Sequence, residues 1–482
     1  MKMDRNKIYS ILTTVFLLIL VYSLSIFFDY SCDLRQGVIG LTIFCILMYI
    51  WLLVSSYRIA KGINIYFALI ILTIPFYLGD QLALLLGFEE LMMQSDHSIL
   101  DGIISDKVIF QAMFFLMESL LCLHLGYLIA YKSKKNKELY EQKRECVNIR
   151  QIKSMKYIGW VFYVLTIIPT IVIRLYDIYM SILLGHLDYR LSGGATGIFY
   201  YFDYLADWFV PACFILLIFA DKKLEKNFAT ISIIIYCVLY LLSGKRMEIV
   251  GFVFATVCIF IYWYKIKISY KKAIKYCIWG ILAIFVFQIV GVARNNAGGL
   301  NMFSADTIAE ILGGSFIYGI LETTGNTFTS IANTIRCVPE YLDFNYGKSI
   351  LGSILYILPS TLREPYLSSI VTHISAVLSP YYYGWNISGY GSSFITEAFF
   401  NYGYFGVIII AIYGIVVGKV INSIENVNLK KPFEFYLAIY MCLEIANGVR
   451  NDLYFIPRHI VLYVLLPYLL SVLLRKSRIR YK

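Results

Sequence analysis

The chain has 482 residues, of which 59% are hydrophobic and only 15% charged, and its mean hydropathy of +0.70 excludes a water-soluble fold. The formal net charge of +11 does not by itself indicate a nucleic acid or another anionic partner, because most basic residues lie in short loops between apolar runs. No stretch is long and polar enough for a separate soluble domain, so we expect a single integral membrane domain over residues 1–482.

Apolar runs long enough to cross a bilayer, which takes about 20 residues, recur along the chain. The first run lacks a small-residue cleavage site, so it predicts a retained helix and not a signal peptide. These runs predict an all-α polytopic membrane protein with about twelve transmembrane helices. The runs near 228–243, 247–264 and 433–447 are the shortest or most interrupted. In chain order the runs lie near 8–28, 37–56, 63–87, 108–131, 157–180, 199–220, 228–243, 247–264, 276–293, 396–418, 433–447 and 456–474.

The loops between these runs alternate in basic content. Of the 42 Lys and Arg residues, 30 lie in loops on one side and 11 on the other, with Arg174 inside the fifth run. Positive residues concentrate on the cytoplasmic side of membrane proteins, so both termini should be cytoplasmic. The alternation persists through all twelve predicted crossings, which supports the predicted count.

One predicted outer loop is much longer than the rest. Residues 294–395 separate the ninth and tenth helices, and a long ordered loop usually has a function. Two apolar segments in it, Ile308 to Leu321 and Ile350 to Leu358, are too short to span. We therefore expect short interfacial or re-entrant helices in this extracytoplasmic loop.

Cations are so depleted on the predicted outer side that the few present are candidate ligands for an anion. Several lie at helix ends, among them Lys245 and Arg246 in the turn SGKR, and Arg294 after the ninth run. Together they could bind the diphosphate of a lipid carrier, because Arg pairs bidentately with phosphate oxygens. The alternative is that each one snorkels to the interface or pairs with a nearby acid. The outer cations are Arg35, Lys107, Arg190, Lys245, Arg246, Arg294, Arg336, Lys348, Arg363, Arg450 and Arg458.

Acids and one histidine on the same side are candidate general bases. A base of this kind must reach an attacking hydroxyl. His373 lies in an apolar context, which favours a hydrogen-bonded packing histidine over a catalytic one, and Glu397 could simply favour a helix N-terminus. The sequence does not decide among Glu322, Asp343, Glu364, His373 and Glu397.

A segment rich in aromatic residues and glycine precedes the tenth run. It reads YYYGWN over 381–386 and SGYGSS over 388–393, and it includes Tyr383, Trp385 and Tyr390. Aromatic faces and small polar groups suit sugar rings, but Tyr and Trp are also typical of the interfacial belt.

No motif for a nucleotide, metal or other cofactor is present in the sequence. There is no phosphate-binding Gly-rich loop ending in Gly-Lys-Ser/Thr, and the ten Cys are scattered without a Cys-x-x-Cys pair. Arg174 lies toward the outer end of the fifth helix and is followed at i+3 by Asp177, which predicts either a local ion pair or an arginine that snorkels to the interface. We expect no cofactor and no metal.

The chain resembles the Wzy-type O-antigen and capsule repeat-unit polymerases. The resemblance rests on about twelve helices, the SGKR turn and the large outer loop in the C-terminal half of the chain. It also rests on the segment GYGSSFITEAFFNYGYFG over 389–406, which leads from that loop into the tenth helix. In architecture it covers most of the chain, and in motif it covers residues 243–418.

The resemblance implies a membrane glycosyltransferase at the outer face of a bacterial inner membrane. It would transfer a growing glycan from undecaprenyl diphosphate onto an incoming lipid-linked repeat unit, without a nucleotide sugar or a metal. By the same resemblance Arg246, Arg294 and Arg336 would stabilise the departing diphosphate, and a chain-length regulator and a flippase of the same pathway could be partners. An O-antigen ligase, a flippase or transporter of the same lipid, and a membrane scaffold or receptor are the alternatives.

Overall fold

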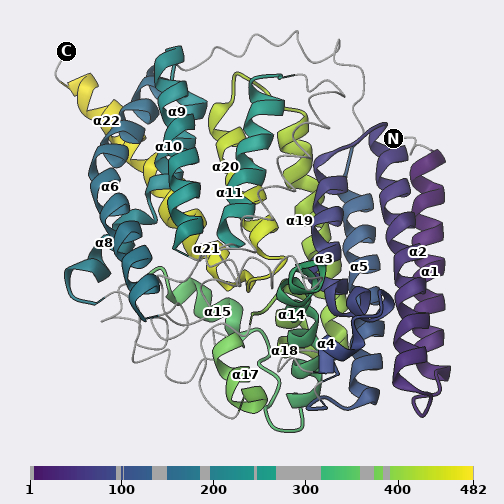
Figure 1. Cartoon of the computed structure of the whole chain (residues 1–482). Helices are drawn as coiled ribbons and strands as arrows, with labels where there is room; N and C mark the ends of the chain where they lie inside the picture. The colour runs from purple at the N-terminus through teal and green to yellow at the C-terminus, as the bar shows by residue number, and fades with distance from the viewer. Residues whose placement is uncertain are drawn as a thin grey trace. The chain divides into compact units, whose positions relative to one another are not determined.

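The computed structural model describes residues 5–93, 99–100, 102–132, 149–184, 196–243, 247–266, 316–358, 374–383 and 391–480. These ranges consist of helices joined by turns and contain no strand (Figure 1). The chain forms two compact units, each built from three separate segments. Unit 1 comprises Met1–Leu139, Ile317–Asn422 and Ile445–Pro457, and unit 2 comprises Tyr140–Phe316, Ser423–Glu444 and Arg458–Lys482.

Unit 1 is built around four long N-terminal helices. Helix α1 contacts α2 and α5, and α2 also contacts α3 and α5 (Figure 1). Helix α5 is the most enclosed of the four, because most of its side chains are buried. The elements of this unit are α1 (Arg5–Phe27), α2 (Leu34–Ala60), α3 (Ile65–Leu85), α4 (Glu89–Met93), α5 (Asp106–Ala130), nearly all of α14 (Phe316–Cys337), α15 (Lys348–Leu355), α17 (Ile374–Tyr383), α18 (Phe394–Tyr402), η4 (Gly403–Phe405), most of α19 (Gly406–Glu425) and η5 (Leu453–Phe455).

Unit 2 is organised around the long helix α6 (Ile149–Leu184), which contacts α8, α9, α10 and α22 (Figure 1). Every side chain of α9 is buried, as expected for a helix surrounded by others. The remaining elements are α8 (Ile198–Ala206), α9 (Phe209–Phe219), α10 (Lys223–Leu242), α11 (Met247–Cys258), the π-helical turn η2 (Ile259–Trp263), most of α20 (Pro432–Asn447), the end of α21 (Ile456–His459), the π-helical turn η6 (Ile460–Leu465) and α22 (Leu466–Arg480).

The all-helical architecture predicted from hydropathy is confirmed in the part of the chain that the structure describes. Nine helical segments there are long and apolar enough to span a bilayer, and they coincide with nine of the twelve predicted runs. The run near 247–264 forms a shorter apolar helix, Ile249–Trp263, and the run near 433–447 forms the 16-residue helix α20. The run near 276–293 lies outside the described residues, so the count of twelve stays a prediction.

The segment expected to form the large outer loop contains a longer helix than its apolar run predicts. Helix α14 has 22 residues, of which only the first few belong to the apolar run ending at Leu321. Thr329 of this helix donates a hydrogen bond from Oγ1 to Oδ2 of Asp80 in α3, at 2.9 Å. Asp80 is buried inside a span-length helix, where an unpaired carboxyl group would be costly. Hydropathy alone predicts that this helix ends near Leu321, whereas contact with α3 explains why it continues to Cys337. Residues 350–355 lie in the short helix α15, as the sequence predicts.

Helices α5 and α19 approach each other closely at a pair of glycines. A Cβ atom on Gly126 would clash with the carbonyl oxygen of Ala411 and would lie 2.9 Å from the Cα of Gly414. Small residues permit such backbone contact in membrane helices, where van der Waals packing drives association. Glycine at this position is therefore a packing requirement.

Replacing Gly126 by alanine should lower the free energy of unfolding by about 1–3 kcal/mol, because the added methyl group forces α5 and α19 apart. Gly40→Ala is the matched control, since no atom lies within 4 Å of the Cβ that it would add in α2. In a helix that change should be neutral or stabilising by up to about 1 kcal/mol. Unfolding of the purified variants in detergent measures both effects. Equal stabilities of the two variants would contradict the packing argument.

Candidate functional site

A buried arginine lies within the helices of unit 2. The guanidinium group of Arg174 in α6 donates to Asp177 Oδ2 and to Asp203 Oδ1, each at 2.7 Å. Its Cζ lies 4.7 Å from the ring centroid of Tyr240. The pair with Asp177 confirms the i+3 ion pair, one of the two alternatives predicted from the sequence, and Asp203 of α8 is a second partner. The side chain of Arg174 is only 2% exposed, so the two carboxylates compensate a buried charge.

A histidine–carboxylate pair lies at the end of α21 in the same unit. Nδ1 of His459 is 2.9 Å from Oε1 of Glu444 in α20, and the two side chains are 26% and 7% exposed. The guanidinium carbon of the neighbouring Arg458 lies 6.0 Å from the ring centroid of Tyr204. Asp207, which is exposed at the junction of α8 and α9, is within electrostatic range of His459, Arg458 and Arg174. We refer to Arg174, Asp177, Asp203, Asp207, Glu444, Arg458 and His459 as the charged cluster of unit 2.

Aromatic rings border the charged cluster on the side of α21. The ring of Tyr463 lies 5.3 Å from His459, 4.9 Å from Trp208 and 5.9 Å from Tyr440, measured between centroids. Tyr463 belongs to the π-helical turn η6, and its carbonyl oxygen accepts a hydrogen bond of 2.6 Å from the hydroxyl group of Tyr436. Single π-helical turns within helices are frequent at functional sites. Charged and aromatic groups side by side can bind a sugar, whose rings stack on aromatic faces and whose hydroxyls pair with carboxylates.

Glu397 lies in a separate, closed network in unit 1. Its Oε1 accepts a hydrogen bond of 2.8 Å from Ser349, and its Oε2 accepts one of 2.5 Å from the backbone amide of Leu453. Asn401, one turn later in α18, donates to Ser349 and accepts from the amide of Gly347. Glu397 is 4% exposed, and both of its oxygens hold other segments of the chain. This geometry suits a positioning residue better than a general base, which remains only a prediction from the sequence.

A second buried carboxyl group accompanies Glu397. Burial and then the negative charge of Glu397 raise the pKa of Asp452 well above its usual range. Two neighbouring carboxylates resist simultaneous ionisation in a buried site.

Arg336, at the end of α14, is bound by backbone groups of unit 1. Its Nη1 donates to the carbonyl oxygen of Ile103 at 2.8 Å, and its Nη2 donates to that of Tyr381 in α17. The side chain thus ties the end of α14 to two neighbouring segments. Arg450, also in unit 1, follows α20, and its carbonyl oxygen accepts from the amide of Ser392 at 3.4 Å.

Several candidates from the sequence lie where the structure gives no description. The helix that contains Tyr383 is described, but the side chain of Tyr383 is not. Of the remaining candidates, the structure brings Arg458 into the charged cluster of unit 2 and places Glu397, Arg336 and Arg450 in unit 1. Outside the described residues are Lys245, Arg246, Arg294, His373, Trp385 and Tyr390.

Comparison with known proteins decides the family. The model of the family described as O-antigen polysaccharide polymerase Wzy matches residues 9–482, nearly the whole chain. The chain belongs to the O-antigen polysaccharide polymerase Wzy family. This confirms the resemblance drawn from the sequence. No curated protein and no solved structure matches the chain.

Membership of the Wzy family, together with the apolar helices, makes the chain a multi-pass membrane protein with a general role in O-antigen polymerisation. The family implies a glycosyltransferase-type polymerase whose substrate is a lipid-linked oligosaccharide. Among the described residues, no group of three or more His, Cys, Asp or Glu side chains is placed to hold a metal ion. The expectation that this Wzy protein needs no metal remains a prediction.

The sequence did not single out His459, Glu444, Asp203 or Asp207 of this Wzy protein. Each belongs to a different helix or helix junction, and their separation along the chain hides their proximity. The available signal was that polar residues inside membrane helices are usually functional or paired. These four residues lie in predicted spans or at their ends, so this rule indicates each of them as a candidate for a functional or paired side chain.

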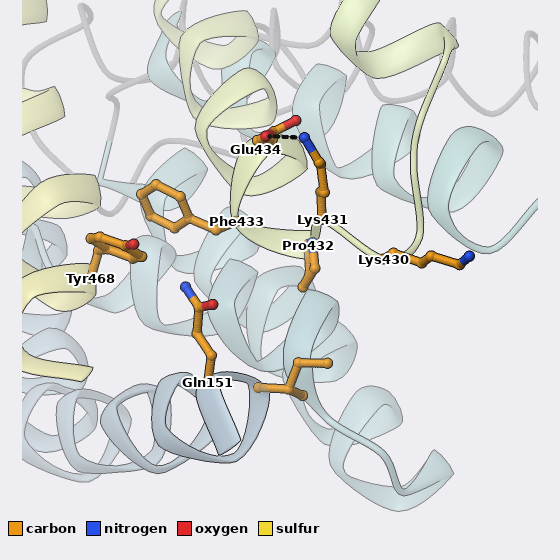
Figure 2. A pocket seen from close by; sticks show the side chains of 8 residues that line it. Gln151, Lys430, Lys431, Pro432, Phe433, Glu434 and Tyr468 are labelled. Atoms are coloured by element: carbon orange, nitrogen blue, oxygen red, sulfur yellow. Dashed lines mark hydrogen bonds and ion pairs between the residues drawn. The ribbon is translucent and has the colours of Figure 1, made fainter. Parts of the chain in front are cut away.

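A pocket of about 230 Å³ lies at the N-terminal ends of α6 and α20 in unit 2 (Figure 2). Figure 2 shows Phe433 facing Tyr468, and Lys431 paired with Glu434 at 3.0 Å. Gln151 on its wall precedes Arg174 by 23 residues of α6, or roughly 35 Å at the rise of an α-helix. The charge asymmetry predicts that this end is cytoplasmic. The pocket is therefore separate from the charged cluster of unit 2. Its lining residues are Gln151, Ile152, Lys430, Lys431, Pro432, Phe433, Glu434 and Tyr468.

Proposed function

We propose that this Wzy-family protein polymerises lipid-linked oligosaccharide repeat units into O-antigen or capsular polysaccharide. The growing chain, carried on undecaprenyl diphosphate, is transferred to the sugar of an incoming repeat unit. The reaction takes place at the outer face of the bacterial inner membrane, and both termini of the protein are cytoplasmic. A flippase supplies the repeat units, and a chain-length regulator acts on the polymer.

Family membership supports polymerisation in general, and the charged cluster of unit 2 is the structural observation that best supports this particular reaction. It combines Arg458, the His459–Glu444 pair and exposed Asp207 with the aromatic rings around Tyr463. These groups can bind a phosphorylated lipid carrier, accept a proton and bind sugar rings, which are the three tasks of the reaction. The charged members Arg458, His459, Glu444 and Asp207 lie near helix ends that the charge asymmetry predicts to be outside.

The predicted outer cations supply the remaining binding roles. Arg246, Arg294 and Arg336 stabilise the diphosphate as it departs, and Lys245, Arg450 and Arg458 hold its phosphates before the reaction. Tyr383, Trp385 and Tyr390 stack on the sugars of the repeat unit. Arg336 can bind a phosphate oxygen with the N–H groups that its two bonds to backbone carbonyl oxygens leave over, because a guanidinium group has five donors.

A strain that lacks this protein should carry single repeat units in place of long glycan chains. Gel electrophoresis of surface glycans measures this, with the wild-type copy restored as control. A ligase would instead leave long polymer on undecaprenol, and a flippase would leave repeat units on the cytoplasmic side. An intact ladder of chain lengths would refute polymerase activity.

A further inference from the structure

We infer that His459, oriented by Glu444, is the general base that accepts the proton of the attacking sugar hydroxyl. This inference rests on the proposed polymerase function and assigns the catalytic base that the sequence leaves open. Glu444 acts as a positioning residue, because it holds the imidazole ring and need not touch the substrate.

The hydrogen bond to Glu444 determines which nitrogen of His459 can act. An ionised carboxylate only accepts hydrogen bonds, so the nitrogen at 2.9 Å, Nδ1, must carry the proton. In the neutral ring the lone pair then lies on Nε2, and proton transfer from a substrate runs through that atom. The carboxylate also stabilises the imidazolium that forms, as in serine hydrolases, where an acid holds the catalytic histidine in the same way.

The surroundings of His459 fit this role on three sides. Burial opposes a positive imidazolium, as does the adjacent Arg458, whereas Glu444 of α20 and Asp207 at the α8–α9 junction are negative and favour it. The ring of Tyr463 lies one helical turn away and packs edge to face with that of Trp208. Tyr463 is buried and Trp208 is half-buried, so Trp208 is the ring of this pair that a sugar could contact. His459 is 26% exposed, so a hydroxyl group can approach the ring, whereas Glu397 in unit 1 is only 4% exposed.

The proposed step balances without a metal or a nucleotide. The acceptor oxygen bonds to the anomeric carbon of the growing chain while its proton passes to Nε2 of His459. The bond between the anomeric carbon and the diphosphate oxygen breaks, and undecaprenyl diphosphate leaves with the electron pair. The imidazolium then releases its proton to water, which restores the base for the next transfer.

The test uses the full-length protein reconstituted in liposomes with its lipid-linked repeat unit. His459→Asn preserves a donor near the position of Nδ1 but supplies no base. It should lower the turnover rate by about 10²–10⁴-fold, the usual contribution of a general base, with little change in KM. Glu444→Gln should lower turnover by about tenfold, again with KM nearly unchanged. Glu434→Gln is the matched control at the opposite end of α20, where the exposed pair with Lys431 should leave turnover within twofold of wild type.

The outcomes separate this inference from the function on which it rests. If wild-type protein forms no polymer, the proposed function fails. If wild type forms polymer and His459→Asn does so at the same rate, the inference is overturned while the function stands. A loss of activity in His459→Asn that is matched by a lower thermal unfolding midpoint and weaker binding of the lipid-linked unit would also overturn it, because the role would then be structural.

Discussion

Replacing Arg174 by methionine should lower the free energy of unfolding by about 3–5 kcal/mol, the typical effect of removing one partner from a buried ion pair. The side chain is 2% exposed and binds Asp177 and Asp203 at 2.7 Å each. Methionine would fill most of the space but leave the buried Asp177 carboxylate uncompensated. Denaturant unfolding of the purified protein in detergent measures the change.

Two further variants make the Arg174 prediction specific. Arg150→Met removes an exposed arginine from the first turn of the same helix and should change stability by less than about 0.5 kcal/mol. Adding Asp177→Asn and Asp203→Asn to Arg174→Met should restore part of the loss, because the buried charge is then gone. If the triple variant is as unstable as Arg174→Met, the loss comes from packing and not from charge.

Arg246→Ala and Arg294→Ala should each abolish polymer formation while leaving the amount of protein in the membrane near normal. The predicted reason is loss of a bidentate partner for the departing diphosphate, whose charge is greatest in the transition state. Lysine at either position should rescue only partly, since it keeps the charge but lacks the planar fork. Glycan gels and membrane immunoblots of the complemented deletion strain measure both quantities.

Arg336→Ala provides the structural contrast to these two variants. Because Arg336 donates to the carbonyl oxygens of Ile103 and Tyr381, its loss should lower membrane abundance as well as polymer length. Membrane abundance therefore separates the structural part of the role of Arg336 from its action on the diphosphate. Unchanged chain length in both Arg246→Ala and Arg294→Ala would rule out a diphosphate clamp.

The membrane helices were predictable because a bilayer imposes a local rule. A helix in lipid must satisfy its backbone internally and be apolar for about 20 residues, so each span is visible in its own segment. The ion pair of Arg174 with Asp177 was predictable for the same reason, since i and i+3 lie on one helix face. Helix α14 was not, because its polar residues, such as Thr329, become favourable only against Asp80 of α3.

The candidate site depended on contacts between distant segments. The sequence indicated Arg458 as a candidate binding residue because cations are rare on the predicted outer side. It did not indicate the neighbouring His459, because no local feature distinguishes a catalytic histidine from a packing one. Glu397 was marked, yet its bonds to Ser349 and Leu453 could not be foreseen. Hydropathy does not report which polar side chains in different helices face one another.

The sequence by itself determined that this is an all-helical, multi-pass membrane protein of the Wzy type, because hydropathy acts segment by segment. Only the tertiary structure decided that Glu444 pairs with His459, that Asp203 joins Asp177 on Arg174, and that Glu397 is enclosed. The reason is physical: a buried charge must find a partner, and in a helical bundle that partner can come from any helix that packs against it.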